Sequence, residues 1–209
     1  MACNNAGRAN FKQKTEELKK FVVKKPPKMG DDGKEIIDEK SARADDHLRW
    51  LIHYILSKRL GSQGLALQSI YVEIIRELNQ AIPNACGQRT VVGLTLSQAA
   101  LIFKKCMVVD EEKFLKVTNV PQGSAAVIKG YLSSLGTFVG SLTVAKNEPI
   151  RSVHLDLKQI LIEGSQVKNG LLAVAFVCRV LKESQHSHVF TPRNPWMQSL
   201  LSILKEIYD

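Results

Sequence analysis

The five histidines are the side chains best suited to metal or proton chemistry, and they do not gather into a recognised motif. His186 and His188 could supply two metal ligands, but no nearby cysteine or carboxylate completes a set. His47, His53 and His154 stand far apart along the chain. No H-E-x-x-H, G-x-S-x-G or paired-carboxylate signature occurs. The sequence therefore predicts a protein that is not an enzyme, without metal or cofactor, in which the two close histidines lie on a solvated loop.

The stretch LGTFVGSLTVAKNEPI, residues 135–150, places Gly136 and Gly140 four residues apart in an apolar setting. Membrane dimers, phosphate loops and closely packed soluble helices all use paired glycines. A membrane span does not fit, because Lys129 and Lys146 enclose too few residues. A phosphate loop needs G-x-x-x-x-G-K-[ST], which the stretch lacks. The spacing therefore predicts a helix-packing device, in which two missing Cβ atoms let a neighbouring helix approach closely.

Positive charge is concentrated at the amino terminus of this chain, whose formal net charge is +9. Before residue 30, Glu16 and Glu17 face eight basic residues: Arg8, Lys12, Lys14, Lys19, Lys20, Lys24, Lys25 and Lys28. The remainder is only mildly basic. Phosphate contacts by these lysines would give weak, salt-sensitive RNA binding, although no aromatic stacking platform interleaves with them.

The four cysteines are scattered and include no C-x-x-C pair that would indicate a zinc or redox site. Cys106 and Cys178 fall inside apolar helical patterns, so we expect buried free thiols. The amino terminus lacks the apolar core of a secretory signal, and no run of about 18 uncharged apolar residues occurs. These features predict a soluble, intracellular protein in a reducing compartment, with no membrane contact.

Apolar residues recur with the helical period of 3.6 along most of the chain. The pattern predicts eight helices, over residues 10–25, 45–60, 65–80, 90–109, 124–146, 156–168, 170–185 and 195–208. Asp45 or Asp46 is the expected N-cap of the second helix, and Asn194, followed by Pro195, that of the last. Proline and glycine mark most of the helix ends.

Three segments follow from this pattern. Residues 1–25 form a basic amino-terminal segment with the first helix, and residues 26–44 mix prolines, glycines and charges without a period, which indicates a linker or surface insertion. Residues 45–209 form the helical domain, onto which we expect the first helix to pack. Consecutive helices with short turns and no βαβ unit favour an all-α fold, a HEAT-like stack of antiparallel helix pairs.

Four stretches of this sequence resemble motifs that occur in the same order in one known family. Residues 135–150 resemble the form LGxWLGxITLAKNKPI, and residues 154–163 (HLDLKQILIE) resemble LDxKxLLxEA. Residues 189–196 (VFTPRNPW) resemble VFxPPNPW, and residues 50–59 match W-x-x-x-Y-x-x-x-K-R. In this order the motifs strongly resemble the MIF4G-type domain of the large scaffold subunit (Not-one) of the eukaryotic CCR-NOT deadenylase complex.

The resemblance implies a domain that catalyses nothing and holds two partners. One is a Caf/Pop-type DEDD deadenylase, which shortens poly(A) tails; the other is a Dhh-type DEAD-box helicase on the concave face. Other CCR-NOT subunits would bind parts of the scaffold outside this fragment. The implied location is the cytoplasm, including mRNA-processing bodies, with the nucleus as a further location. The positions that the resemblance assigns to the helicase face are Lys58, Arg59, Thr143, Lys146, Asn147, Asn194 and Trp196.

The residues alone leave plainer roles open for some of these positions. Trp196 could fill the core at a helix start, and Asn194 could serve only as a cap. Two further functions compete with the scaffold: direct RNA binding through the basic terminus, and an initiation-factor-type adaptor that binds the initiation helicase.

Overall fold

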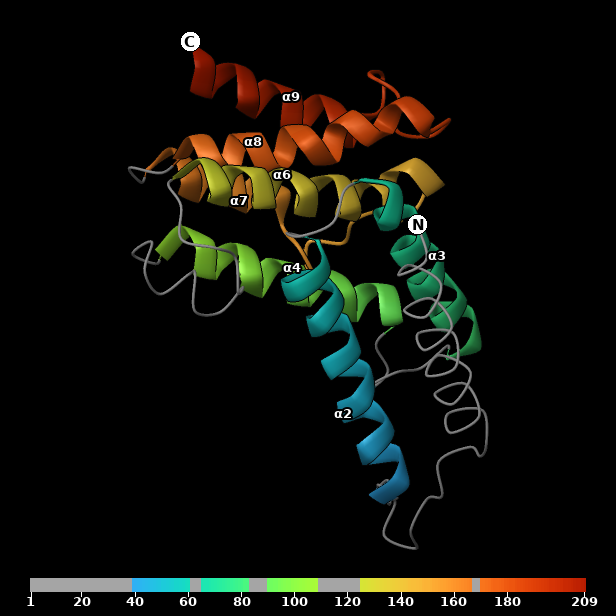
Figure 1. Cartoon of the computed structure of the whole chain (residues 1–209). Helices are drawn as coiled ribbons and strands as arrows, with labels where there is room; N and C mark the ends of the chain where they lie inside the picture. The colour runs from blue at the N-terminus through green and yellow to red at the C-terminus, as the bar shows by residue number, and fades with distance from the viewer. Residues whose placement is uncertain (1–38, 61–64, 83–89, 109–124, 167–169) are drawn as a thin grey trace, which may run out of the picture.

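The computed structural model describes residues 39–60, 65–82, 90–108, 125–166 and 170–209, and the regular structure in these ranges is helical (Figure 1). The α-helices there are α2 (Glu39–Tyr54), α3 (Leu65–Ala81), α4 (Val91–Val108), α6 (Ala125–Leu142), α7 (Leu157–Ser165), α8 (Gly170–Lys182) and α9 (Pro195–Tyr208). Short helices η1 (Ile55–Arg59), η2 (Val144–Lys146) and η3 (Glu183–His186) follow α2, α6 and α8. This is the predicted all-α fold. None of the described helices is long and apolar enough to cross a bilayer.

The start of α2 differs from the prediction. The described chain is already helical at Glu39, so that residues 39–44 of the predicted linker belong to α2. Asp45 and Asp46 lie within the helix and do not cap it. The reason is that Glu, Lys, Ala and Arg in residues 39–44 are strong helix formers, which outweigh a local capping signal. The helix predicted over residues 10–25 lies outside the described residues.

The end of α6 also differs, because the helix stops at Leu142 and not near residue 146. Thr143 leaves the helical conformation, with φ −120° and ψ −79°, and one 3₁₀ turn follows. Asn147 then adopts φ 62°, in the left-handed region. Asparagine tolerates that region better than most residues, so the 3₁₀ turn ends at Asn147.

α6 and α8 lie side by side and run in the same direction. A Cβ atom at Gly136 would lie 2.6 Å from the carbonyl oxygen of Phe176, and one at Gly140 would lie 2.6 Å from that of Val180. A step of four residues along α6 therefore matches a step of four along α8. This is the close helix approach that the glycine spacing predicts.

The helices around this pair complete a stack. α7 and α8 form an antiparallel hairpin, in which a Cβ atom at Gly164 would meet Ala173, and α9 packs on α7. Figure 1 shows these carboxy-terminal helices as layers above α4, with α2 and α3 crossing them steeply. Alternate helices that run parallel, with hairpins between them, are the HEAT-like arrangement that we expected.

Side-chain caps fix several helix starts. The Thr90 hydroxyl accepts a hydrogen bond from the Gly93 N–H (3.0 Å), and the Asn79 side-chain oxygen from α3 accepts one from the Val92 N–H (3.1 Å). The Asp156 carboxylate accepts two backbone N–H bonds at the start of α7. Each cap satisfies donors that the first helical turn leaves unpaired. The Asn79 bond also joins α3 to α4.

Large apolar side chains from every described α-helix form one core. The rings of Phe103 in α4 and Phe176 in α8 have centroids 4.9 Å apart. The Tyr131 hydroxyl donates a hydrogen bond to the Leu56 carbonyl (2.8 Å), which joins α6 to η1. Aromatic pairs and satisfied buried hydroxyls both favour a single packed arrangement.

The two cysteines of the described residues differ in environment. Cys106 is buried, and burial raises the pKa of its thiol to about 12, so that the group stays neutral and packs as an apolar side chain. Cys178 is exposed on α8, and the prediction that it is buried was wrong. Apolar residues occur on more of the α8 surface than the neighbouring helices bury. Leu171, which is 83% exposed, is an example.

Candidate partner-binding surface

The predicted contact residues Lys146, Asn147, Asn194 and Trp196 come from two elements that the structure brings together. Lys146 and Asn147 lie at the end of η2, where they are exposed, and Asn194 and Trp196 begin α9, where they are half-buried. The segment 187–190 connects the two elements. We call these four residues and that segment the η2–α9 surface.

Asn147 holds this surface together. Its Oδ1 accepts hydrogen bonds from the Ser187 hydroxyl (2.8 Å), the His188 N–H (3.0 Å) and the Val189 N–H (3.2 Å). The left-handed backbone of Asn147 turns the side chain toward this segment. The side-chain oxygen is thus used within the molecule, which gives Asn147 a structural role besides any partner contact.

Asn194 continues the connection into α9. Its Nδ2 donates to the Val189 carbonyl (3.2 Å), and its Oδ1 accepts from the N–H groups of Trp196 (2.9 Å) and Met197 (3.4 Å). The predicted N-cap is therefore confirmed. The Trp196 ring meets Phe190 edge-on, with centroids 5.3 Å apart, and the half-buried indole keeps part of its surface accessible.

Thr143 does not lie on this surface. Its side chain is fully buried, and its hydroxyl donates to the Val139 carbonyl at 2.7 Å. The prediction of a partner contact by this side chain is therefore wrong. Threonine can satisfy its hydroxyl on the preceding turn of its own helix, so a polar residue in a motif need not face solvent.

Lys58 and Arg59 come from another element of the structure. They lie in η1, after α2, and their side chains are outside the described part of the chain. Their contribution to a helicase contact stays a prediction.

Exposed basic side chains accompany the η2–α9 surface. Lys146, His188 and Arg193 are exposed, and so is the apolar Val189, at 51%. Among the described residues, no group of three or more metal-ligating side chains occurs. Cations beside apolar and aromatic groups suit the binding of a protein or of a nucleic-acid backbone.

Comparison with known families identifies the family of this chain. Residues 33–209 match the family model described as the CCR4-NOT transcription complex subunit 1 CAF1-binding domain. The chain belongs to this family. The match covers all the residues that the structure describes, so the helical stack is the CAF1-binding domain itself.

Curated relatives agree with this assignment. The chain is 24% identical to the general negative regulator of transcription subunit 1 of Schizosaccharomyces pombe, over all of this chain and 8% of the relative. It is 24% identical to the CCR4-NOT transcription complex subunit let-711 of Caenorhabditis elegans, over 84% of this chain and 6% of the relative. The Saccharomyces cerevisiae general negative regulator of transcription subunit 1 is 23% identical, over 99% of this chain and 8% of the relative. The chain thus spans under a tenth of these relatives' length.

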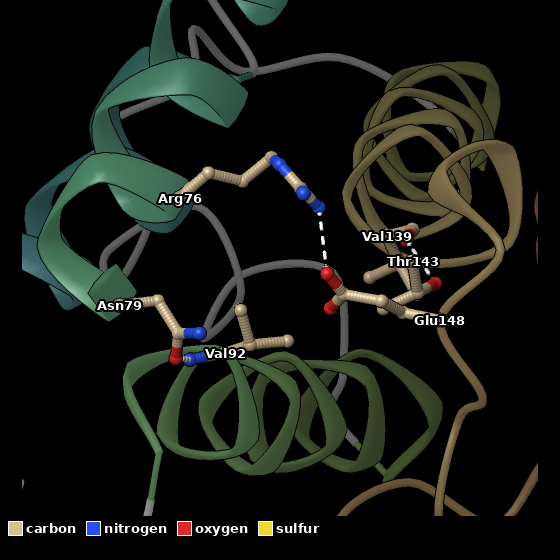
Figure 2. A network of polar contacts seen from close by, with 6 residues as sticks. All are labelled: Arg76, Asn79, Val92, Val139, Thr143 and Glu148. Atoms are coloured by element: carbon tan, nitrogen blue, oxygen red, sulfur yellow. Dashed lines mark hydrogen bonds and ion pairs between the residues drawn. The ribbon is translucent and has the colours of Figure 1, made fainter. Parts of the chain in front are cut away.

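One ion pair of this CAF1-binding domain was not predicted. Arg76 in α3 donates to the Glu148 carboxylate at 2.9 Å, across the space between α3 and the turn after η2 (Figure 2). Residue 148 is glutamate where the form LGxWLGxITLAKNKPI has lysine. The sequence showed this difference, but not that residues 72 positions apart would meet.

Exchange of the two charges tests this pair. We expect Glu148→Lys alone to lower the free energy of unfolding by about 1 kcal/mol, because two cations then face each other in a partly exposed site. Arg76→Glu combined with Glu148→Lys should restore most of the loss. Urea unfolding of both variants, with and without high salt, measures the effect, which screening should reduce. Equal losses in the single and double variants would contradict a direct pair.

Proposed function

We propose that this chain is a non-catalytic scaffold domain that binds a CAF1-type deadenylase within a CCR4-NOT complex. The observation that carries the proposal is the match of residues 33–209 to the CAF1-binding domain model. The names of the relatives, which are those of complex or regulatory subunits, support a scaffold. We further propose a MIF4G-type stack that acts in poly(A) shortening, translational repression and mRNA decay, in the cytoplasm, including mRNA-processing bodies, and in the nucleus.

The packed helical stack suits a positional mechanism. A domain whose helices share one core holds bound partners at a fixed separation. Two enzymes bound side by side then act on one messenger at a high effective concentration, without any new contact between them. The chain's own contribution is geometry, so it needs no reactive side chain.

Co-elution tests the deadenylase proposal. The purified chain and the CAF1-type deadenylase of the same organism, mixed in equal amounts, should elute together in size-exclusion chromatography, with the summed mass by light scattering. Separate elution of two folded proteins would count against the proposal. The other complex subunits should not be needed for this result.

We also propose that the η2–α9 surface binds a Dhh-type DEAD-box helicase. Its basic Lys146 and partly accessible Trp196 offer a charged contact beside an aromatic anchor. Arginine and tryptophan are frequent in the energetic centres of protein interfaces, which supports including Arg59, with Lys58 next to it. Binding there could bias the helicase between its open and closed states.

Charge reversal on the η2–α9 surface tests the second partner. We expect Lys146→Glu to weaken helicase binding about tenfold, because a cation at the rim is replaced by an anion. Lys205→Glu, the same change at an exposed position in the last turn of α9, is the matched control and should bind like the wild type. Biolayer interferometry with the immobilised chain measures both, and deadenylase binding should stay unchanged in each. Equal affinities of the helicase for the two variants would show that Lys146 is not part of the contact.

Direct RNA binding and an initiation-factor-type adaptor are the competing functions. The net charge of +9 favours some contact with phosphates. Fluorescence anisotropy with labelled poly(A) across a salt series should show binding that vanishes by physiological salt. Tight binding at that salt would favour an RNA-binding protein, and binding to the initiation helicase would favour the adaptor.

A further inference from the structure

The outward side of α4 carries apolar and basic side chains in one row. Ser97, Leu101, Lys104 and Lys105 follow each other at the spacing i, i+4, i+7 and i+8, which is one face of a helix. Leu101 is 52% exposed, and both lysines are exposed. The opposite side of α4 is buried, where the helix packs against α2, α3 and α6. The described part of the fold therefore leaves this face of α4 open from Leu101 onward.

The loop before α7 borders this row. The Nδ1 atom of His154 is 3.3 Å from the Ser97 hydroxyl, and a Cβ atom at Gly93 would lie 2.6 Å from its Nε2. The histidine ring thus covers the row as far as Ser97 and fixes the loop on α4. Next to it in the loop, Val153 is 79% exposed, and Arg151 is exposed as well. We call the following five residues the α4–loop surface: Leu101, Lys104, Lys105, Arg151 and Val153.

The charges of the α4–loop surface are all positive. The neighbouring acids of the loop, Glu148 and Asp156, are both used within the molecule. Glu148 pairs with Arg76 at 2.9 Å, and the Asp156 carboxylate caps α7. The three cations of the surface, by contrast, have no ion pair with any described residue. The surface is therefore complementary in charge to an acidic partner.

The apolar residues of the surface favour a protein partner over RNA. Two exposed apolar side chains, Leu101 and Val153, accompany the cations. Base stacking would need an accessible ring, but Phe103, the aromatic residue of α4, is buried. An acidic amphipathic helix offers both an apolar stripe and carboxylates beside it, and such helices bind to apolar surfaces through residues spaced by three and four positions.

We propose that the α4–loop surface binds an acidic amphipathic helix of a protein partner. Leu101 and Val153 contact the apolar stripe of this helix, and Lys104, Lys105 and Arg151 contact its carboxylates. The contact removes apolar surface from water, and the opposite charges set the orientation of the bound helix. It requires neither the deadenylase nor the helicase.

Fluorescence anisotropy with a model peptide and the whole chain tests this binding. The probe is a labelled peptide of about 15 residues, long enough to form a helix, with leucine at helical spacing, glutamate beside the leucines and alanine elsewhere. We expect the chain to bind this peptide at physiological salt. A shuffled peptide of the same composition, whose leucines form no stripe, should bind about tenfold more weakly, because it cannot present both groups on the correct sides.

Two exposed leucines provide a matched pair of variants. Leu101→Glu should weaken binding of the peptide about tenfold, because it replaces an apolar contact by an anion that faces carboxylates. Leu171→Glu makes the same change at an 83% exposed leucine of α8 and should bind the peptide like the wild type. Both side chains are exposed, so both variants should fold, which circular dichroism confirms.

Two pairs of lysines separate a local contact from attraction by the net charge of +9. Lys104→Glu combined with Lys105→Glu should weaken binding of the peptide by about tenfold or more. Lys182→Glu combined with Lys205→Glu lowers the net charge equally, at exposed positions of α8 and α9, and should keep most of the binding.

Three results would overturn the proposal. The wild-type chain could fail to bind the peptide, the shuffled peptide could bind equally well, or both members of each variant pair could lose binding to the same extent. Labelled poly(A) is the second probe. Binding of poly(A) that falls with Lys104→Glu and Lys105→Glu, in a chain that does not bind the peptide, would show an RNA-binding surface instead.

Discussion

Gly136→Ala and Gly140→Ala are each expected to lower the free energy of unfolding by about 2 to 3 kcal/mol, as for an overpacked core. An added methyl at Gly136 would lie 2.6 Å from the Phe176 carbonyl oxygen and 2.8 Å from the Arg179 Cβ. At Gly140 it would lie 2.6 Å from the Val180 carbonyl oxygen. Backbone atoms cannot rotate away, so α6 and α8 must separate.

Gly130→Ala is the matched control for this effect, because it makes the same change in the same helix. Apart from its chain neighbours and the local backbone of its own helix, no atom lies within 4 Å of the added methyl there, and the position is exposed. This variant should therefore gain up to about 1 kcal/mol from the higher helix propensity of alanine. Alanine is thus expected to destabilise the fold at residues 136 and 140 and to stabilise it at residue 130. Urea denaturation of the three variants measures it, and equal stabilities at positions 130 and 136 would contradict the close packing of α6 on α8.

Asn147→Ala is expected to lower the free energy of unfolding by about 2 kcal/mol, from two separate causes. Alanine in the left-handed region costs about 1 kcal/mol or more, and the Ser187, His188 and Val189 donors lose their common acceptor. These donors are near solvent, so water replaces part of the lost bonding. Because the same segment reaches Asn194, the proposed binding of a helicase should weaken as well.

Two further variants at residue 147 separate these causes. Asn147→Gly removes the backbone penalty but not the loss of the acceptor, so it should fall between alanine and the wild type. Asn147→Asp keeps an oxygen acceptor and should be close to the wild type. Hydrogen exchange at the amides of residues 188 and 189 should accelerate in the alanine and glycine variants only. Slow exchange in all three would show that Asn147 does not hold this segment.

The helices could be predicted from the sequence because their signals are local. Apolar periodicity gave α3, α4, α8 and α9 to within a few residues, and Asn194 with Pro195 gave the start of α9. The same local reasoning failed at Asp45, where the preceding residues carry the helix further back. It failed again at Thr143, which leaves the helical conformation although the apolar pattern continues beyond it.

The candidate surface was only partly predictable, because it depends on contacts between distant segments. The motif resemblance supplied Lys146, Asn147, Asn194 and Trp196, and the structure joins them through residues 187–190. It could not show that the oxygen of Asn147 is used internally. The direction of a side chain and its bonding partners emerge only when the helices are packed.

Isothermal titration calorimetry of the chain with the CAF1-type deadenylase of the same organism tests the central claim most directly. The scaffold account predicts a saturable, equimolar complex, which persists in physiological salt and forms equally with Lys146→Glu. No heat of binding, with a chain that circular dichroism shows to be folded and a deadenylase that is active on poly(A), would contradict the account.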